Sequence, residues 1–87
     1  MENIAAQFEH AATDSKALAS KPDNDTLLQL YSLYKQATLG DAPADGGYGM
    51  FDFVAKAKHE AWKALQGLGK DEAMQQYVEL VNKLKQS

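Results

Sequence analysis

The sequence predicts an all-α protein built from four helices. Four segments repeat their apolar residues at steps of three and four, which places those residues on one face of a helix. No run of five or more residues alternates apolar and polar side chains as a half-buried strand does. A chain of 87 residues has room for one domain, so we expect residues 1–87 to form a single unit.

The first two predicted helices each have one apolar face. The second begins after Pro22, where three polar residues at 23–25 offer an N-cap and negative charge in the first turn, and it ends at Gly40. The periodic positions of the first helix are Ile4, Phe8, Ala11, Ser15 and Leu18. Those of the second helix are Leu27, Leu30, Leu33, Tyr34 and Ala37.

The last two predicted helices follow the same pattern. Gly67 ends the third helix, and the acids Asp71 and Glu72 lie in the opening turn of the fourth. The connections at 19–23 and 66–70 are short, which favours antiparallel neighbours at both ends of the chain. The third helix has its periodic positions at Phe53, Ala57, Ala61, Ala64 and Leu65. The fourth has them at Ala73, Tyr77, Leu80, Val81 and Leu84.

The connection at residues 40–52 contains four glycines and a proline, so we expect it to be irregular. It is longer than the roughly 2–8 residues that usually join helices in bundles. Two interpretations stay open: an ordered loop with a function, or a simple crossover between helices that are not neighbours.

Composition excludes several classes of function. The nine basic residues are all lysines, and twelve acids give a net charge of −3, which disfavours nucleic-acid binding because a basic field supplies most of that affinity. Without cysteine, neither a disulfide nor a thiolate metal site can form. The N-terminus lacks the basic start and apolar core of a secretory signal, and no segment approaches the roughly 20 apolar residues of a membrane span. We therefore expect a cytoplasmic protein.

No residue pattern points to catalysis. His10 and His59 belong to no metal-ligand spacing, so we interpret both as surface or boundary residues. The serines occur in no nucleophile motif, and Asp71 with Glu72 fits a helix N-terminus better than an acid–base pair. The sequence therefore predicts that the protein is not an enzyme and holds no metal.

One face of the second helix carries polar aromatic residues beside a positive charge. Because successive helical residues turn by about 100°, Tyr31, Tyr34 and Lys35 fall within an arc of roughly 100°. Tyrosine can stack on a base and bond a phosphate, and lysine supplies charge. From spacing alone, however, an amphipathic helix with core-lining tyrosines is the favoured interpretation. Core positions are likewise favoured for Trp62 and Tyr77.

The order of residues adds what spacing does not. A motif LxxYxxYKQATxGD begins at Leu28, and it is accompanied by KPD at 21–23, MFDF at 50–53, KAKHEAW at 56–62 and LQGLGKDEAMQQYVELV at 65–81. Phe8 stands in the first helix before an Ala-Ala pair at 11–12. With these motifs in order, essentially the whole chain resembles the acyl-CoA-binding protein family. The matching residues of the first motif are Leu28, Tyr31, Tyr34, Lys35, Gln36, Ala37, Thr38, Gly40 and Asp41.

The resemblance implies an up-down-down-up bundle with a long overhand connection between the second and third helices. It also implies noncatalytic intracellular binding, transport and buffering of medium- to long-chain acyl-CoA thioesters, by a monomer without a cofactor. The partners would be long-chain acyl-CoA itself and, transiently, membranes or enzymes that use acyl-CoA.

The resemblance also implies a site. Tyr31, Lys35 and Lys58 would hold the ribose 3′-phosphate of CoA. The other residues implied at the CoA nucleotide are Lys16, Ser32, Leu33, Tyr34 and Tyr77. Those implied in the acyl groove are Phe8, Ala12 and Leu28.

This sequence departs from the family pattern at two helix positions and in the connecting loop, where Gly47 and Tyr48 stand in place of the usual basic residue and proline. Val54 stands where a lysine is usual, and His59 replaces the first of two tryptophans, which packs close to the ligand in the family. We therefore expect Lys35 and Lys58 to carry more of the phosphate recognition than in typical relatives. The departures also leave a second interpretation open: a helical protein–protein interaction module with an acidic face and a weakened acyl-CoA site.

Overall fold

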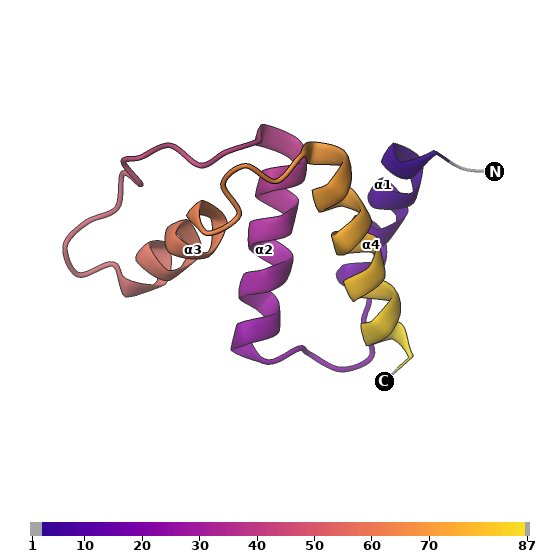
Figure 1. The fold of residues 1–87 in the computed structure, drawn as a ribbon. Coiled ribbons are helices and arrows are strands. Elements are labelled where there is room, and N and C mark those ends of the chain that lie inside the picture. Colours follow the sequence, from indigo (N-terminus) through magenta and orange to yellow (C-terminus); the bar gives the residue numbers. More distant parts are fainter. Residues whose placement is uncertain (1–2, 87) are drawn as a thin grey trace.

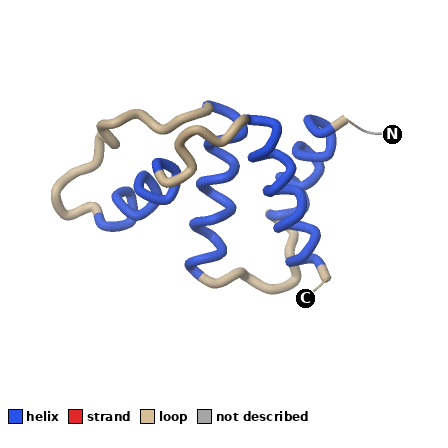
Figure 2. Tube along the Cα trace, viewed as in Figure 1, coloured by secondary structure: helices blue, strands red, loops and turns tan. Residues whose placement is uncertain are grey.

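The computed structural model describes residues 3–86 and contains four α-helices: α1 (Ile4–Ser15), α2 (Asn24–Leu39), α3 (Phe53–Lys63) and α4 (Lys70–Lys85) (Figures 1 and 2). No strand occurs in residues 3–86, so the all-α prediction is confirmed. None of the helices in this range is both long enough and apolar enough to cross a bilayer.

Side-chain caps define the starts of three helices. Asp23 Oδ1 accepts a hydrogen bond of 2.8 Å from the backbone N–H of Thr26, which confirms the predicted N-cap of α2. This bond from the Thr26 backbone is the main cause that lowers the pKa of the Asp23 carboxyl. Asn3 and Asp52 cap α1 and α3 in the same way. Gly69 offers no side chain at the start of α4, where Asp71 and Glu72 complement the positive helix end instead.

The ends of α1 and α3 fall earlier than the periodicity predicts. Leu18 and Leu65 lie beyond the helices, because the chain tightens into turns with i to i−3 hydrogen bonds after Ser15 and Lys63. The predicted stop of α2 at Gly40 is confirmed. Its φ of 84° lies in the region that favours glycine.

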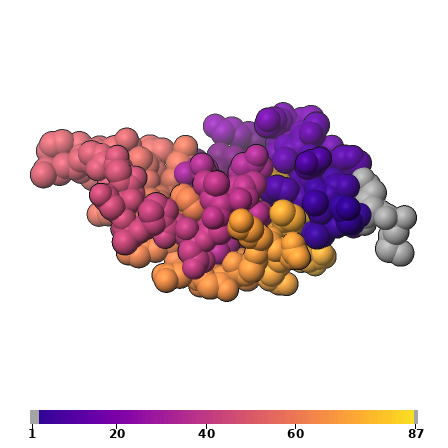
Figure 3. Space-filling model, turned by 90° about the horizontal axis from the view of Figure 1, so that it is seen from above, coloured from indigo at the N-terminus to yellow at the C-terminus, as the bar shows by residue number. Residues whose placement is uncertain are grey.

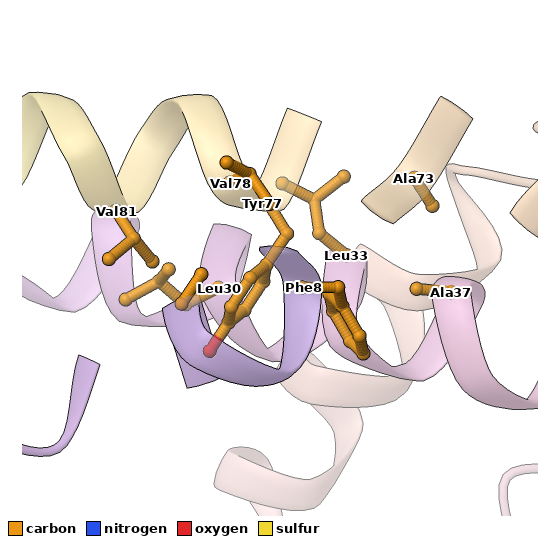
Figure 4. Packing of buried hydrophobic residues seen from close by; sticks show 9 residues of the cluster. Phe8, Leu30, Leu33, Ala37, Ala73, Tyr77, Val78 and Val81 are labelled. Atoms are coloured by element: carbon orange, nitrogen blue, oxygen red, sulfur yellow. The ribbon is translucent and has the colours of Figure 1, made fainter. Parts of the chain in front are cut away.

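The core is shared by α1, α2 and α4. The Cα atoms of α4 approach both α1 and α2 within 8 Å, and α3 packs on α2 (Figure 1). Seen from above, α3 and the connection before it form one end of the molecule, opposite α1 (Figure 3). In Figure 4, Tyr77 reaches from α4 to lie beside Phe8 of α1. The buried cluster consists of Phe8, Ala11, Leu30, Leu33, Ala37, Ala73, Tyr77, Val78 and Val81.

The prediction that helices adjacent in sequence would be close neighbours at both ends of the chain is wrong for α3 and α4, and α1 and α2 meet only through side chains. Within the described residues, α1 and α2 have no Cα atoms within 8 Å of each other, and neither do α3 and α4. The backbone of α4 packs closely on both α1 and α2, whereas α1 reaches α2 only through side chains, such as the stack of Phe8 on Tyr34. The senses of the helices, with α1 and α4 one way and α2 and α3 the other, confirm the up-down-down-up arrangement.

The connection at 40–52 does not join distant helices, so the crossover interpretation is wrong in that form. Instead it joins α2 and α3, which pack against each other and run in the same sense. The chain must therefore return along α2, whose 16 residues span about 24 Å at 1.5 Å per residue. This return path explains the length of the connection.

Three residues of the motifs noted in the sequence, Gln36, Asp41 and Trp62, hold this connection in place. Gln36 is fully buried, and its Nε2 donates hydrogen bonds to Asp41 Oδ1 (2.9 Å) and to the carbonyl of Leu68 (2.8 Å). Asp41 Oδ1 also accepts the backbone N–H of Gly67 at 2.9 Å. Trp62 Nε1 donates to the Gly40 carbonyl at 2.8 Å. These bonds fix α3 and the turn after it to the C-terminal end of α2.

Candidate functional site

Two lysine ammonium groups meet at one tyrosine ring where α2 packs on α3. Lys35 Nζ lies 5.7 Å from the centre of the Tyr31 ring, and Lys58 Nζ lies 5.2 Å from the same centre. Lys35 Nζ is also 5.8 Å from the ring of Trp62, which is buried as predicted. Within residues 3–86, neither ammonium forms an ion pair with a carboxylate. An anion placed between these two cations would relieve their repulsion.

Three aromatic rings meet around Tyr34, which lies about one helical turn after Tyr31 on α2, and one of the three is open to solvent. Phe8 stacks on Tyr34 with ring centres 5.4 Å apart and meets Tyr77 edge-on at 5.1 Å. Tyr34 is 43% exposed, whereas Phe8 and Tyr77 are buried. Tyr77 Oη donates a 3.1 Å hydrogen bond to Ser15 Oγ, and burial is the main cause that raises the pKa of the Tyr77 hydroxyl. Tyr34 is therefore the ring of this group that a ligand could reach.

An apolar groove of about 400 Å³ runs between the first half of α2 and the first two turns of α3. Its wall is mostly aliphatic and aromatic, and Lys58 belongs both to this wall and to the cation cluster. The groove therefore offers apolar surface that leads to positive charge. The residues that line it are Asn24, Leu27, Leu28, Phe53, Val54, Ala57 and Lys58.

The structure brings together Tyr31, Lys35 and Lys58, the three residues expected at the 3′-phosphate. Of the predicted acyl residues, Leu28 lines the groove, but Phe8 is a core residue and Ala12 packs against the core. Lys16 is exposed at the C-cap of α1, one residue after Ser15, whose hydroxyl accepts the hydrogen bond from Tyr77. Ser32 and Leu33 are buried, with 4% and 7% exposure, so their side chains face the core.

Sequence reasoning missed most of the α3 side of the groove. Phe53 and Ala57 already stood out as periodic positions of the third helix, which indicated an apolar face without showing that it turns toward α2. Val54, noted for the lysine it replaces, supplies apolar wall instead of charge.

His59 is not the surface or boundary residue that the sequence indicated. It is buried, and its ring centre lies 5.8 Å from that of Tyr48 in the connection. Gly46 covers it so closely that a Cβ there would lie 2.8 Å from His59 Cγ. The His59 Nε2 atom is buried without a hydrogen-bond partner. His59 thus supports the connection and does not line the groove. His10, by contrast, is exposed as expected.

The candidate site contains no metal centre: within the described part of the chain, no group of three or more His, Cys, Asp or Glu side chains could hold an ion. What the arrangement can accommodate is an amphiphile. Its anionic end would meet Lys35 and Lys58, and its apolar end would follow the groove between α2 and α3.

Comparison with known proteins agrees with this geometry. The model of the family described as acyl CoA binding protein matches residues 5–81. The chain is 49% identical over 81 residues to acyl-CoA-binding protein homolog 1 of Caenorhabditis elegans, covering 93% of each protein. The crystal structure of acyl-CoA-binding protein 2 from Oryza sativa superposes with a TM-score of 0.87 at 38% identity, covering 97% of this chain and 92% of that one.

A third relative has a different length. Enoyl-CoA delta isomerase 2 of Rattus norvegicus is 49% identical over all 87 residues, but the match covers only 22% of that protein. The similarity to the isomerase is therefore to one segment of a longer chain. Both the family match and the full-length relative lead to one conclusion: the chain belongs to the acyl-CoA-binding protein family.

Proposed function

We propose that the protein binds acyl-CoA thioesters without catalysing their conversion. The observation that carries this proposal is the continuity between an apolar groove and a pair of lysines that share one tyrosine ring. An acyl-CoA has the same polarity pattern, with a long apolar chain joined to a multiply charged nucleotide.

The nucleotide end would be held mainly by charge. Lys35 and Lys58 would donate to the 3′-phosphate, and hydrogen bonds of this charged kind contribute about 1.5–3 kcal/mol each. Tyr31 would lie between the two ammonium groups, and Tyr34 would offer its exposed ring to the nucleotide. Lys16 could add a contact from the end of α1.

The buried residues of the expected site would position the ligand-contacting residues from the core side. Phe8 and Tyr77 support the ring of Tyr34, so we assign them to positioning that ring. Ser32 and Leu33 face the core and would hold α2 in place, as Ala12 would do for α1.

The acyl chain would lie in the groove, with Leu28 in its wall. Burial of each methylene contributes up to about 0.8 kcal/mol, so each should tighten binding up to about fourfold until the groove is full. Val54 extends this apolar wall, which offsets the charge lost at that position.

The biological role that fits such a site is that of a carrier. We propose that residues 1–87 act as one acyl-CoA-binding domain that buffers and transports medium- to long-chain acyl-CoA. Further parts of the proposal are a cytoplasmic location, a monomeric state, the absence of a cofactor, and transient contact with enzymes that use acyl-CoA. The interaction-module alternative is not proposed, since Val54 lies in the groove wall and His59 lies under the connection, both compatible with a ligand site.

Native mass spectrometry tests the proposal directly. The protein is mixed in turn with palmitoyl-CoA, free CoA and palmitate, with the two fatty ligands below their critical micelle concentrations. A dominant 1:1 complex is expected with palmitoyl-CoA only. Calorimetry with C8 to C16 acyl-CoA then measures how affinity changes with the length of the acyl chain. Equal affinities along this series would contradict the assignment of the groove to the acyl chain. Release of free CoA over time would contradict the noncatalytic role.

A further inference from the structure

Four large apolar side chains are exposed where the connection enters α3. Met50 is 85% exposed, Phe51 81%, Phe53 71% and Val54 67%. We call these four residues the apolar tip. They belong to the segment that forms one end of the molecule in Figures 1 and 3. Apolar side chains exposed this closely together commonly mark a surface that contacts something other than water.

The apolar tip is continuous with the acyl groove. Phe53 and Val54 are in both, because they line the groove while most of their surface remains exposed. Met50 and Phe51 extend the apolar surface beyond the groove and do not line it. A fatty chain leaving the groove at this end would therefore meet apolar side chains.

Charge on α3 has the opposite sign to that of the whole chain, while one acid, the N-cap Asp52, lies between Phe51 and Phe53. The net charge of the protein is −3, yet α3 contains three lysines and one glutamate. Of the four described helices, α3 alone has an excess of positive charge.

The lysines also flank the apolar residues of α3. At about 100° per residue, Phe53 and Val54 define an apolar arc, with Lys56 about 60° beyond Phe53 and Lys58 about 40° beyond Val54. Apolar residues between lysines are typical of helices that lie in the interface of a bilayer, where lysine stems extend toward the headgroups.

We propose that the apolar tip, with Lys56 and Lys58, is a docking surface for a lipid bilayer that contains anionic headgroups. Two observations favour a bilayer over a protein partner: the positive charge of α3, and the continuity of the tip with a groove for a fatty chain. The second rests on the proposed function. Docking in this orientation brings the open end of the groove to the depth of the lipid chains. With α3 only 11 residues long, the contact is peripheral and reversible.

Vesicle flotation with unliganded protein tests the surface. Phosphatidylcholine vesicles are compared with vesicles containing about one-third phosphatidylglycerol, and wild type is expected to float with the anionic vesicles. The double variant Met50→Ser/Phe51→Ser is expected to lose at least tenfold in partitioning. Leu39→Ser is the matched control, because Leu39 is also exposed (61%) but lies at the end of α2. Lys56→Glu is expected to weaken anionic binding, whereas Lys70→Glu on α4 is not.

A second measurement reports the depth of each residue. Because the chain has no cysteine, Met50→Cys and Leu39→Cys each provide one labelling position. An environment-sensitive dye at position 50 is expected to shift to the blue and brighten several-fold on anionic vesicles. The same dye at position 39 is expected to stay unchanged.

Three outcomes overturn the docking surface: wild type that floats with neither vesicle, a double variant that floats as well as wild type, or a wild-type dimer in sedimentation equilibrium that the double variant abolishes. The last would mean that a second copy covers the tip. Calorimetry distinguishes failure of the docking surface from failure of the proposed function, because Met50→Ser/Phe51→Ser is expected to keep palmitoyl-CoA affinity within twofold. Vesicle binding without any acyl-CoA binding would refute the proposed function while the docking surface stands.

Discussion

The molecule has two regions that are stabilised in different ways. The three-helix core, formed by α1, α2 and α4, contains the buried cluster, and no residue of α3 belongs to that cluster among the described residues. The α3 arm, comprising the 40–52 connection and α3, is held by a few specific contacts, such as the Trp62–Gly40 hydrogen bond and the packing of Tyr48 on His59. Its exposed residues include Met50 and Phe51.

This difference shows how a small domain can combine stability with an open site. The core supplies the apolar burial that stabilises the fold. The arm is free to leave apolar surface uncovered, and the candidate groove lies along the boundary, with one wall from α2 and the other from α3. Each prediction below changes one region and leaves the other as its control.

The largest expected effect is on core stability. Leu33→Ala removes a buried side chain from α2 and should lower the free energy of unfolding by about 2–5 kcal/mol, as measured by urea denaturation. Phe51→Ala in the arm should change it by about 0.5 kcal/mol or less, because the side chain is exposed. A comparable loss of unfolding free energy in both variants would mean that Phe51 is buried in solution as Leu33 is.

The next largest effect is on ligand affinity at the boundary. Lys58→Ala should remove a charged contact worth about 1.5–3 kcal/mol, which weakens palmitoyl-CoA binding roughly 10- to 150-fold in calorimetry. Binding of the 3′-dephospho analogue should change little, and Lys35→Ala should behave in the same way. Lys56→Ala, on another face of α3, is the control. Equal losses for both ligands would reject the phosphate assignment.

A third prediction concerns packing within the arm. Gly46→Ala places a Cβ against His59 and Tyr48, and overpacking of this kind typically costs about 1–3 kcal/mol. Gly49→Ala in the same connection meets open space, so its effect should stay within about 1 kcal/mol and can be stabilising. Thermal unfolding monitored by circular dichroism compares the two. Identical melting temperatures would show that Gly46 does not closely cover His59.

The smallest effect is the pH dependence of the contact between core and arm. The backbone hydrogen bond from Gly67 and then the side-chain bond from Gln36 lower the pKa of Asp41. A carboxyl whose pKa is lower in the folded state stabilises the fold above its unfolded pKa of about 3.9. That stabilisation is lost as the pH falls through the folded-state value.

Asp41→Asn should therefore be less stable than wild type at pH 7, and the gap should narrow below about pH 4. Urea denaturation at a series of pH values measures the difference in the free energy of unfolding between wild type and variant. Asp45→Asn in the same connection is the control. A gap that is constant from pH 7 to 3 would contradict the role of the Asp41 charge.

Much of the fold could be predicted because helix signals are local. Asp23 caps α2 through a bond to Thr26 three residues away, and Gly40 ends the same helix through its own φ angle. The ends of two helices could not be predicted from periodicity. Leu18 and Leu65 fit the helical spacing but lie outside the helices, because the backbone there forms turns with i to i−3 hydrogen bonds. The order of residues added a family resemblance, which implied that Tyr31, Lys35 and Lys58 hold one phosphate. The structure places these three residues together.

The sequence by itself determined the four helices, the angle of each residue on its helix and the family to which the motifs belong. Only the tertiary structure decided that α4 packs on both α1 and α2, that His59 is buried under Gly46, and that Phe53 and Ala57 face Leu28 across a groove. The physical reason is that periodicity describes one helix about its own axis. Which neighbour covers a given face depends on contacts between segments far apart in the chain.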